Sequence, residues 1–326
     1  MATPVREPIL KISNLSIAYP ISIGTVRAVE DVSLTVLKGE ILGIVGESGC
    51  GKSTMGLAIL NLLKPPGRIT QGRIEYQGTD ILAMDRRQLM ALRGPQIAMI
   101  FQNPLTSLDP LMSVADHFIE TIRAHEPGTS AKECLERAAA ILVDLGIEPK
   151  RLNEYPFQLS GGMRQRIMIG LALILHPAVL LADEPTTALD VIVEAGFTEL
   201  LAALGKRYNL TVVLVTHNLA MVAEVAERIG VMYGGRIVEL ASAEEIFARP
   251  LHPYTQGLIA CVPNIRLEQI ELNAMPGSPP DLVGERNYCS FHPRCPYAMD
   301  ICRSQCPSLE TIEGRQVACW LHERKA

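Results

Sequence analysis

A nine-residue glycine-rich stretch, Gly46–Thr54 (GESGCGKST), constrains this chain more than any other feature. It fits the P-loop pattern Gly-x-x-x-x-Gly-Lys-Ser at Gly46, Gly51, Lys52 and Ser53. The apolar run before it, Ile41–Val45, is typical of a buried strand, and Met55–Leu63 after it reads as a helix. Strand, glycine loop and helix are the context in which such a loop binds phosphate, so the sequence predicts a nucleotide site.

The residue types suit that chemistry directly. Glycines let the backbone turn tightly and point successive N–H groups at phosphate oxygens, and the helix start adds the positive end of its dipole. We expect Lys52 to reach the β- and γ-phosphates and the Ser53 hydroxyl to bind Mg²⁺. Cys50 occupies a variable position, and we interpret its side chain as a bystander. The predicted nucleotide contacts of the loop are Gly46, Glu47, Ser48, Gly49, Cys50, Gly51, Lys52, Ser53 and Thr54.

Composition limits the protein class. The 326 residues are 48% hydrophobic but only 5% aromatic, which favours a globular α/β protein rich in aliphatic side chains. A formal net charge of −5 argues against a nucleic-acid binder, which usually carries a basic surface. The first ten residues lack the apolar core of a signal peptide, so we expect a cytosolic chain. For eight cysteines in such a chain, a metal or cluster is a better interpretation than disulfides.

Several further strands and helices are predicted along the chain. Leu10–Val36 reads as two strands joined by a turn, in which Tyr19 either stacks on a nucleotide base or is an ordinary half-buried strand residue. Between 111 and 174 the pattern becomes helical, as an insertion in a β/α chain. The other predicted strands are Gly72–Gln77, Ile97–Phe101, Val179–Glu184 and Thr211–Val215, and the inserted helices are Ser113–Ala124, Ala131–Leu145 and Gly161–Leu173.

Polar residues at three of these element ends are candidate site residues. The strand Val179–Glu184 ends in two acids, of which Asp183 suits a Mg²⁺ ligand and Glu184 suits a base that orients water. His217 follows the strand Thr211–Val215, where a lone histidine is more often structural than functional. At the third end, Ser160 can cap a helix whose first residues are two glycines, which predicts a second anion-binding helix start.

Together these motifs resemble those of the ATP-binding cassette (ABC) ATPases. The resemblance assigns Gly46–Ser53 to Walker A, Gln102 to the Q-loop, Leu159–Gln165 to the signature, Val179–Glu184 to Walker B, Ala188–Asp190 to the D-loop and His217 to the switch histidine. It implies an α/β P-loop NTPase fold, with a RecA-like α/β core, an antiparallel β subdomain and an inserted helical subdomain. It also implies catalytic roles for Lys52, Gln102, Glu184 and His217, magnesium binding by Ser53, Gln102 and Asp183, and nucleotide contacts by Tyr19 and Asp190.

In that family two cassettes pack head to tail, and each ATP lies between the P-loop of one and the signature of the other. This chain has one P-loop and no internal repeat, so we expect it to be half of a pair. The resemblance implies that the signature residues act on the ATP of the partner. These residues are Ser160, Gly161, Gly162 and Gln165.

The resemblance extends to the ATPases of peptide importers. It rests on Phe101–Pro110, His252–Gln256, Pro276–Pro280 and the run from Cys289 to Ala298. It implies ATP hydrolysis coupled to import of dipeptides or oligopeptides, a second and related ATPase subunit, two permease subunits and an extracellular solute-binding protein. The chain would then lie peripherally on the cytoplasmic face of a bacterial inner membrane. Import of nickel chelates or glutathione is an alternative, and a soluble cassette without a transport role is a weaker one.

Five of the eight cysteines fall in the last forty residues, in a segment poor in aliphatic side chains. We therefore predict a nucleotide-binding domain at 1–250, with its helical insertion at about 103–175, and a small irregular cysteine-rich extension at 251–326. All-thiolate ligation suits either an iron-sulfur cluster or zinc, and free thiols are the third possibility. The importer resemblance implies a [4Fe-4S] cluster and leaves Cys306 as an extra residue. Its ligands would be Cys289, Cys295, Cys302 and Cys319.

Overall fold

Two compact units make up the structure. The computed structural model describes residues 6–102, 107–186, 191–261 and 275–322. The P-loop unit combines residues 1–82 with 215–326, and the helical unit comprises residues 83–214. Each unit is described by itself below.

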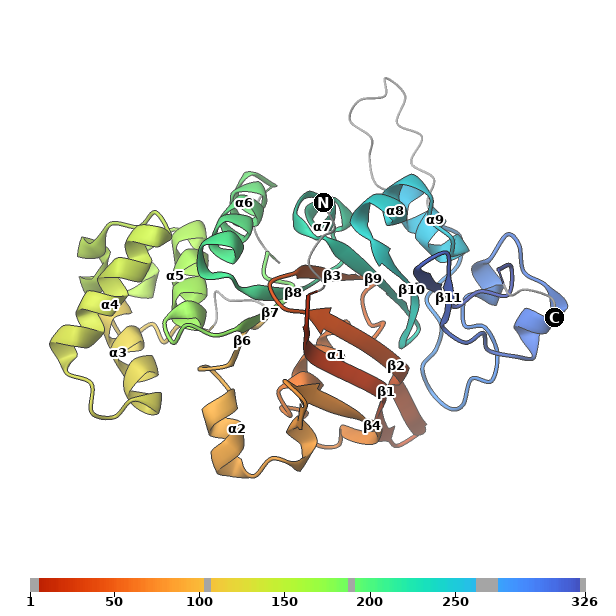
Figure 1. Cartoon of the computed structure of the whole chain (residues 1–326), viewed down its shortest axis with the longest axis horizontal. Coiled ribbons are helices and arrows are strands. Elements are labelled where there is room, and N and C mark those ends of the chain that lie inside the picture. The colour runs from red at the N-terminus through yellow and green to blue at the C-terminus, as the bar shows by residue number, and fades with distance from the viewer. Residues whose placement is uncertain (1–5, 103–106, 187–190, 262–274, 323–326) are drawn as a thin grey trace, which may run out of the picture. The chain divides into compact units, whose positions relative to one another are not determined.

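An antiparallel sheet forms the first layer of the P-loop unit. Its strand order is β2-β1-β4-β5, and β1 and β2 form the predicted hairpin (Figure 1). Leu10 and Ile12 of β1 are buried and alternate with polar neighbours, the two-residue period of a strand with one covered face. The strands are β1 (Pro8–Ile21), β2 (Gly24–Leu37), β4 (Arg68–Tyr76) and β5 (Thr79–Asp80).

A second sheet of the P-loop unit holds the strand that leads into the glycine loop. Its order is β11-β12-β10-β9-β3, and β3 pairs in parallel with β9. All five residues of β3 are buried, as its continuous apolar run predicts. Helix α7 (Leu219–Val225) packs on β3 so closely that a Cβ on Gly43 would lie 2.2 Å from Val222 Cγ1. The strands are β3 (Ile41–Val45), β9 (Arg228–Tyr233), β10 (Arg236–Ser242), β11 (Glu310–Ile312) and β12 (Arg315–Val317).

Short helices complete the P-loop unit. They are α1 (Lys52–Ile59), α7 (Leu219–Val225), α8 (Ala243–Ala248) and α9 (Pro253–Ala260), with 3-10 turns η1 (Ile81–Ala83), η5 (His292–Arg294) and η6 (Asp300–Arg303). Helix α1 begins directly at the P-loop lysine, three residues earlier than predicted. Its first turn therefore belongs to the glycine loop, and its N–H groups point out of the helix start.

The helical unit holds the predicted insertion. Helices α3, α4 and α5 of this unit (Figure 1) lie within one residue of the predicted ranges. Serines cap all three, through Ser113, Ser130 and Ser160. Strand β7 pairs in parallel with β6, and its other neighbour is β8, whose last two residues lie beyond the unit boundary in the sequence. The elements are β6 (Ile97–Ile100), β7 (Val179–Asp183), β8 (Thr211–Thr216), α2 (Arg86–Leu92), α3 (Val114–His125), α4 (Ala131–Asp144), α5 (Gly161–Leu173), α6 (Val191–Tyr208), η3 (Pro149–Asn153) and η4 (Pro156–Gln158).

The C-terminal segment differs from the predicted irregular extension. Strand β12 pairs with β10 through Glu239 and Val317, and β11 pairs with β12, so this part extends the sheet of the P-loop unit. Val317 and the aliphatic stem of Arg315 are buried there, which gives the segment a share of an existing core. Contacts also divide the chain after residues 82 and 214, whereas the predicted insertion spans about 103–175.

Candidate nucleotide site

Glycine is required where the P-loop turns into α1. Gly51 has a φ of 101°, and a Cβ at this position would lie 2.1 Å from the carbonyl oxygen of Ala28. Any side chain would therefore clash with backbone as well as strain the dihedral. The tight turn aims the first N–H groups of α1 into the loop, which is the arrangement that binds phosphate at helix starts.

The lysine of the loop is held inside it. Lys52 is 3% exposed, and its Nζ donates hydrogen bonds to the carbonyl oxygens of Gly46 at 2.7 Å and Glu47 at 3.0 Å. An ammonium group needs such oxygen partners when buried. Phosphate oxygens can replace these carbonyls as acceptors, so the lysine is already placed at the position where a nucleotide phosphate would enter.

The remaining predicted loop residues differ in exposure. Ser48 and Gly49 are exposed at the loop tip, and Ser53 and Thr54 are half-buried in the first turn of α1. Burial raises the pKa of the Cys50 thiol above its usual value, which keeps it protonated and poorly nucleophilic at neutral pH. This agrees with the interpretation of its side chain as a bystander.

Two other predicted nucleotide contacts lie in the P-loop unit. Tyr19 is half-buried on β1, and its ring lies against Gly67, where a Cβ would come within 2.4 Å of the tyrosine Cε1. His217 follows β8 and is exposed. Both side chains are partly or fully exposed. This geometry fits a nucleotide contact as well as an ordinary structural role for each residue.

The helical unit brings Gln102 and Glu184 together. Strand β7 is fully buried, and it delivers Asp183 and Glu184 at its end. Glu184 is 8% exposed and has a φ of 42°, a left-handed conformation that is uncommon outside glycine and occurs at functional sites. Gln102 Nε2 donates a hydrogen bond of 2.9 Å to Glu184 Oε2. An amide that orients a carboxylate in this way prepares it to accept a proton from water.

The signature segment also lies in the helical unit. Ser160 is exposed and caps α5 by accepting from the N–H of Met163 at 3.3 Å, and a Cβ on Gly161 would meet no atom within 4 Å. Gln165, in contrast, is 2% exposed and donates to the carbonyl oxygen of Pro185 at 2.6 Å. Within this chain Gln165 therefore fastens α5 to the turn after β7. The predicted contact Asp190 lies outside the described residues.

All eight cysteines lie among the described residues, and none of them forms a disulfide. The four cysteines predicted as cluster ligands line one small cavity, together with Trp320 and His252 among others. Cys306 instead lines a neighbouring cavity. Burial raises the pKa of Cys289 to about 12 and that of Cys319 to about 11, so these groups are protonated unless a cation offsets the burial. The residues that line the first cavity include Cys289, Cys295, Cys302 and Cys319.

No group of three or more histidine, cysteine, aspartate or glutamate side chains is arranged to hold a metal ion within the described residues. The predicted zinc or iron-sulfur site therefore has no support from a compact ligand set. Over the same residues, no helix combines the length and the apolar character that crossing a bilayer would require.

Two residues without a predicted role contact the P-loop directly. Arg294 Nη1 and Nη2 donate to the carboxylate of Glu47 at 2.8 and 2.9 Å, and the N–H of Glu47 donates to the hydroxyl of Tyr254 at 3.0 Å. Their partners lie more than 200 residues away in sequence, and periodicity carries no information over such a distance. The available signal was the occurrence of both residues in segments that resemble those of peptide importers.

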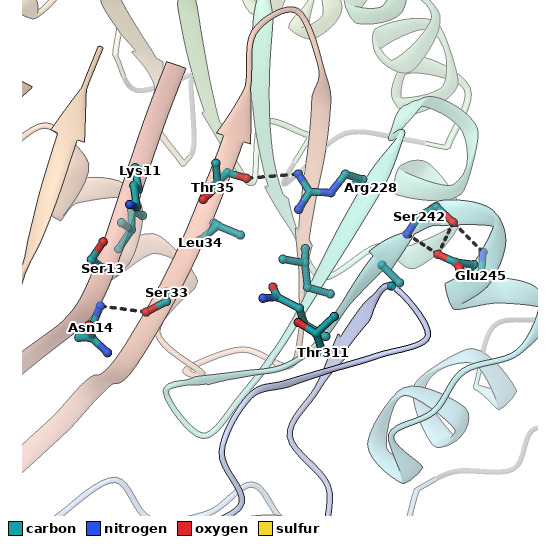
Figure 2. A pocket seen from close by; sticks show the side chains of 15 residues that line it. Lys11, Ser13, Asn14, Ser33, Leu34, Thr35, Arg228, Ser242, Glu245 and Thr311 are labelled. Atoms are coloured by element: carbon teal, nitrogen blue, oxygen red, sulfur yellow. Dashed lines mark hydrogen bonds between the residues drawn. The ribbon is translucent and has the colours of Figure 1, made fainter. Parts of the chain in front are cut away.

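A separate cavity of about 670 Å³ lies in the P-loop unit between the β1–β2 hairpin and β10 with α8 (Figure 2). None of the predicted site residues is among the described residues that line it. Arg228 in its wall pairs with Glu40 at 3.1 Å, and Glu245 accepts from the hydroxyl of Ser242 at 2.7 Å. These charges are engaged within the protein, so the cavity is not the candidate site.

Family profiles match two parts of the chain. The profile described as ABC transporter matches residues 29–187, and the one described as oligopeptide/dipeptide transporter, C-terminal region, matches residues 238–302. The first range contains the P-loop, Gln102, the signature and Glu184. The second contains Tyr254 and Arg294, the two residues that contact the P-loop from the C-terminal segment.

Curated relatives match almost the whole chain. The dipeptide transport ATP-binding protein of Caldanaerobacter subterraneus subsp. tengcongensis is 42% identical over 97% of this chain and 97% of its own length. The protein of the same description from Escherichia coli K12 is 43% identical over 95% of this chain and 96% of its own length. The oligopeptide transport ATP-binding protein of Salmonella typhimurium is 42% identical over 98% of this chain and 96% of its own length.

Solved structures with the same fold include a dimeric ATP-binding cassette in a post-hydrolysis state bound to ADP and Pi. It has a TM-score of 0.64 and 31% sequence identity, over 72% of this chain and 98% of that one. CbiO1 from Clostridium perfringens, part of an ABC transporter complex, has a TM-score of 0.64 and 29% sequence identity, over 74% of this chain and 92% of that one.

Proposed function

The chain belongs to the family of dipeptide and oligopeptide transport ATP-binding proteins, and we propose on that premise that it powers the import of short peptides. It is an ABC-type transport ATPase with the cassette fold. The observation that carries the proposal is the P-loop with its buried lysine between β3 and α1. The match of residues 238–302 to a peptide-transporter profile supports peptides as the solute class.

Each site residue has a proposed role in hydrolysis. Lys52 and the loop N–H groups bind the β- and γ-phosphates, while Ser53, Gln102 and Asp183 would hold Mg²⁺. Bound Mg²⁺ would neutralise charge that develops on the phosphates. Glu184, oriented by Gln102, accepts a proton from the attacking water, and His217 contacts the γ-phosphate.

We further propose that the active enzyme contains a second ATPase subunit, related but different. The exposed Ser160 and the open surface at Gly161 support a role for the signature in binding the ATP of that partner. Two permease subunits would hold the pair on the cytoplasmic face of the inner membrane, and an extracellular binding protein would deliver the solute. Residues 1–250 would form the nucleotide-binding domain, with its helical insertion at about 103–175, and 251–326 the importer-specific extension.

The test uses the chain purified in complex with the second ATPase subunit and the two permease subunits. Addition of a dipeptide-loaded binding protein should stimulate ATP hydrolysis severalfold, and Lys52→Ala should abolish hydrolysis because the γ-phosphate loses its cation. Stimulation by a nickel chelate or glutathione in place of peptide would favour the alternative solutes. A chain that binds no permease subunit and hydrolyses ATP alone would instead favour a soluble cassette.

The cysteines carry a second proposal, a [4Fe-4S] cluster bound by Cys289, Cys295, Cys302 and Cys319. Their shared cavity supports this ligand set, whereas Cys306 lines only a neighbouring cavity, which it shares with Cys289. A single zinc ion needs four sulfurs at about 2.3 Å from one point, whereas a cluster spaces its thiolates more widely. The described residues show no compact ligand set for either group, and zinc remains the alternative.

Iron and acid-labile sulfide analysis of protein purified without oxygen tests the cluster. We expect four irons and four sulfides per chain and broad visible absorption that is lost in Cys302→Ser. The matched control is Cys306→Ser, which should keep both. A colourless protein with one zinc per chain, or one with neither metal, would contradict this proposal.

A further inference from the structure

We propose that Arg294 is a positioning residue for ATP binding, because it fixes the P-loop through Glu47. This inference rests on the proposed nucleotide site but not on the solute or on the cluster. The two residues are 247 positions apart, and the contact joins the C-terminal segment to the loop that binds phosphate.

The guanidinium of Arg294 is anchored on its own side. Its side chain is 6% exposed, and Nε donates to the carbonyl oxygen of Pro276 at 2.9 Å. Nη1 also reaches the hydroxyl of Tyr233 at 3.3 Å, and the group lies 5.7 Å from the centre of that ring and 6.0 Å from that of Phe291. Hydrogen bonds and cation–π contacts thus hold the guanidinium in one orientation, independently of its contact with the P-loop.

Both carboxylate oxygens of Glu47 accept hydrogen bonds from this guanidinium. The two parallel N–H···O bonds, 2.8 and 2.9 Å long, define the position and the plane of the carboxylate, which a single contact would not do. The glutamate side chain is thereby occupied within the protein, and its backbone N–H is donated to Tyr254. Its contribution to the site is therefore to hold the loop in place.

The effect reaches the phosphate-binding lysine through one residue. The carbonyl oxygen of Glu47 accepts a hydrogen bond from Lys52 Nζ. Arg294, Glu47 and Lys52 thus form a continuous series of contacts from the C-terminal segment to the cation that binds the β- and γ-phosphates. Loss of Arg294 would release the Glu47 carboxylate and let the first half of the loop move, and each displacement of the loop weakens the phosphate contacts.

The test is ATP binding by the purified full chain, measured by calorimetry with EDTA present to prevent hydrolysis. Arg294→Ala should raise the Kd for ATP about tenfold, and Arg294→Lys, which keeps one charged contact, about threefold. Glu47→Ala should match Arg294→Ala, and the double variant should be no weaker than either single variant. The matched control Arg249→Ala removes an exposed arginine–glutamate pair with Glu313 in the same unit and should leave the Kd unchanged.

A merely structural role would lower the Tm without this pattern. We expect kcat at saturating ATP, in the complex with the permeases, to stay within about twofold while the KM for ATP rises. Should Arg294→Ala fail to fold, Glu47→Ala tests the same contact with the C-terminal segment intact. A wild-type Kd in either single variant, or additive effects in the double variant, overturns the inference. Failure of the wild-type chain to bind ATP would instead refute the proposed function.

Discussion

At the scale of single residues, Glu184 combines three properties that rarely coincide. It is almost buried, it has left-handed backbone geometry, and its carboxylate accepts a hydrogen bond from Gln102. A strained backbone persists only where its surroundings enforce it, here the buried strand β7 on one side. The strain points the carboxylate to one place, and this suits a group that must meet a single water molecule.

Glu184→Gln should reduce kcat for ATP hydrolysis at least about 100-fold, because glutamine cannot accept a proton. Its amide oxygen can still accept from Gln102, so we expect the Kd for ATP to change less than about threefold. Unhydrolysed ATP should then hold the paired cassettes together, as an ATP-dependent dimer on size-exclusion chromatography. Glu199→Gln, an exposed position on α6, is the control and should behave as wild type. Undiminished turnover in Glu184→Gln would rule out this residue as the base.

At the scale of elements, the position of α9 depends on one buried acid of β10. Glu239 is 0% exposed, and its carboxylate accepts the N–H groups of Leu251 at 2.8 Å and His252 at 2.9 Å. His252 in turn caps α9 by accepting from the N–H of Tyr254. Because the hydroxyl of Tyr254 accepts the N–H of Glu47, Glu239 contributes indirectly, through α9, to holding the P-loop in position.

Glu239→Ala should lower the free energy of unfolding by about 3 kcal/mol, because it leaves the buried N–H of His252 and the half-buried N–H of Leu251 without acceptors. Glu239→Gln keeps one acceptor and should lower it by about half as much. Urea denaturation at constant m-value provides the measurement. The exposed Glu224 of α7 supplies the control, since Glu224→Ala should change the value by less than about 0.5 kcal/mol. Equal stabilities of the Glu239→Ala and Glu224→Ala variants would show that this contact does not hold α9.

At the scale of the whole molecule, the parts that the sequence could predict are those with local signals. Helical periodicity located α3, α4 and α5 to within a residue, with the cap at Ser160 as an additional signal for α5, and the P-loop pattern located the turn from β3 into α1. The short strands β11 and β12 were missed because three-residue strands with charged ends have no usable period. Their pairing with β10 depends on tertiary contacts that no local pattern encodes.

The same distinction applies to the candidate site. Motif spacing indicated Lys52 and Glu184 as candidates, because the chemistry of phosphate and water dictates these residue types, and the family resemblance added Gln102. It could not indicate that Gln165 turns inward to Pro185, or that Arg294 holds Glu47. Both contacts depend on how distant segments approach each other, which is set by packing.

The P-loop unit is built from both ends of the chain, and this has a consequence for its synthesis. Strand β3 leaves the ribosome early, but its parallel neighbour β9 follows only after the helical unit of about 130 residues has been made. At about 5–20 residues per second, the delay is on the order of 10 s. During that time the helical unit can fold, whereas the apolar β3 still lacks β9. Translation pauses within residues 83–214 would prolong this exposure, so nascent chains of this protein should depend on chaperones mainly at their N-terminal end.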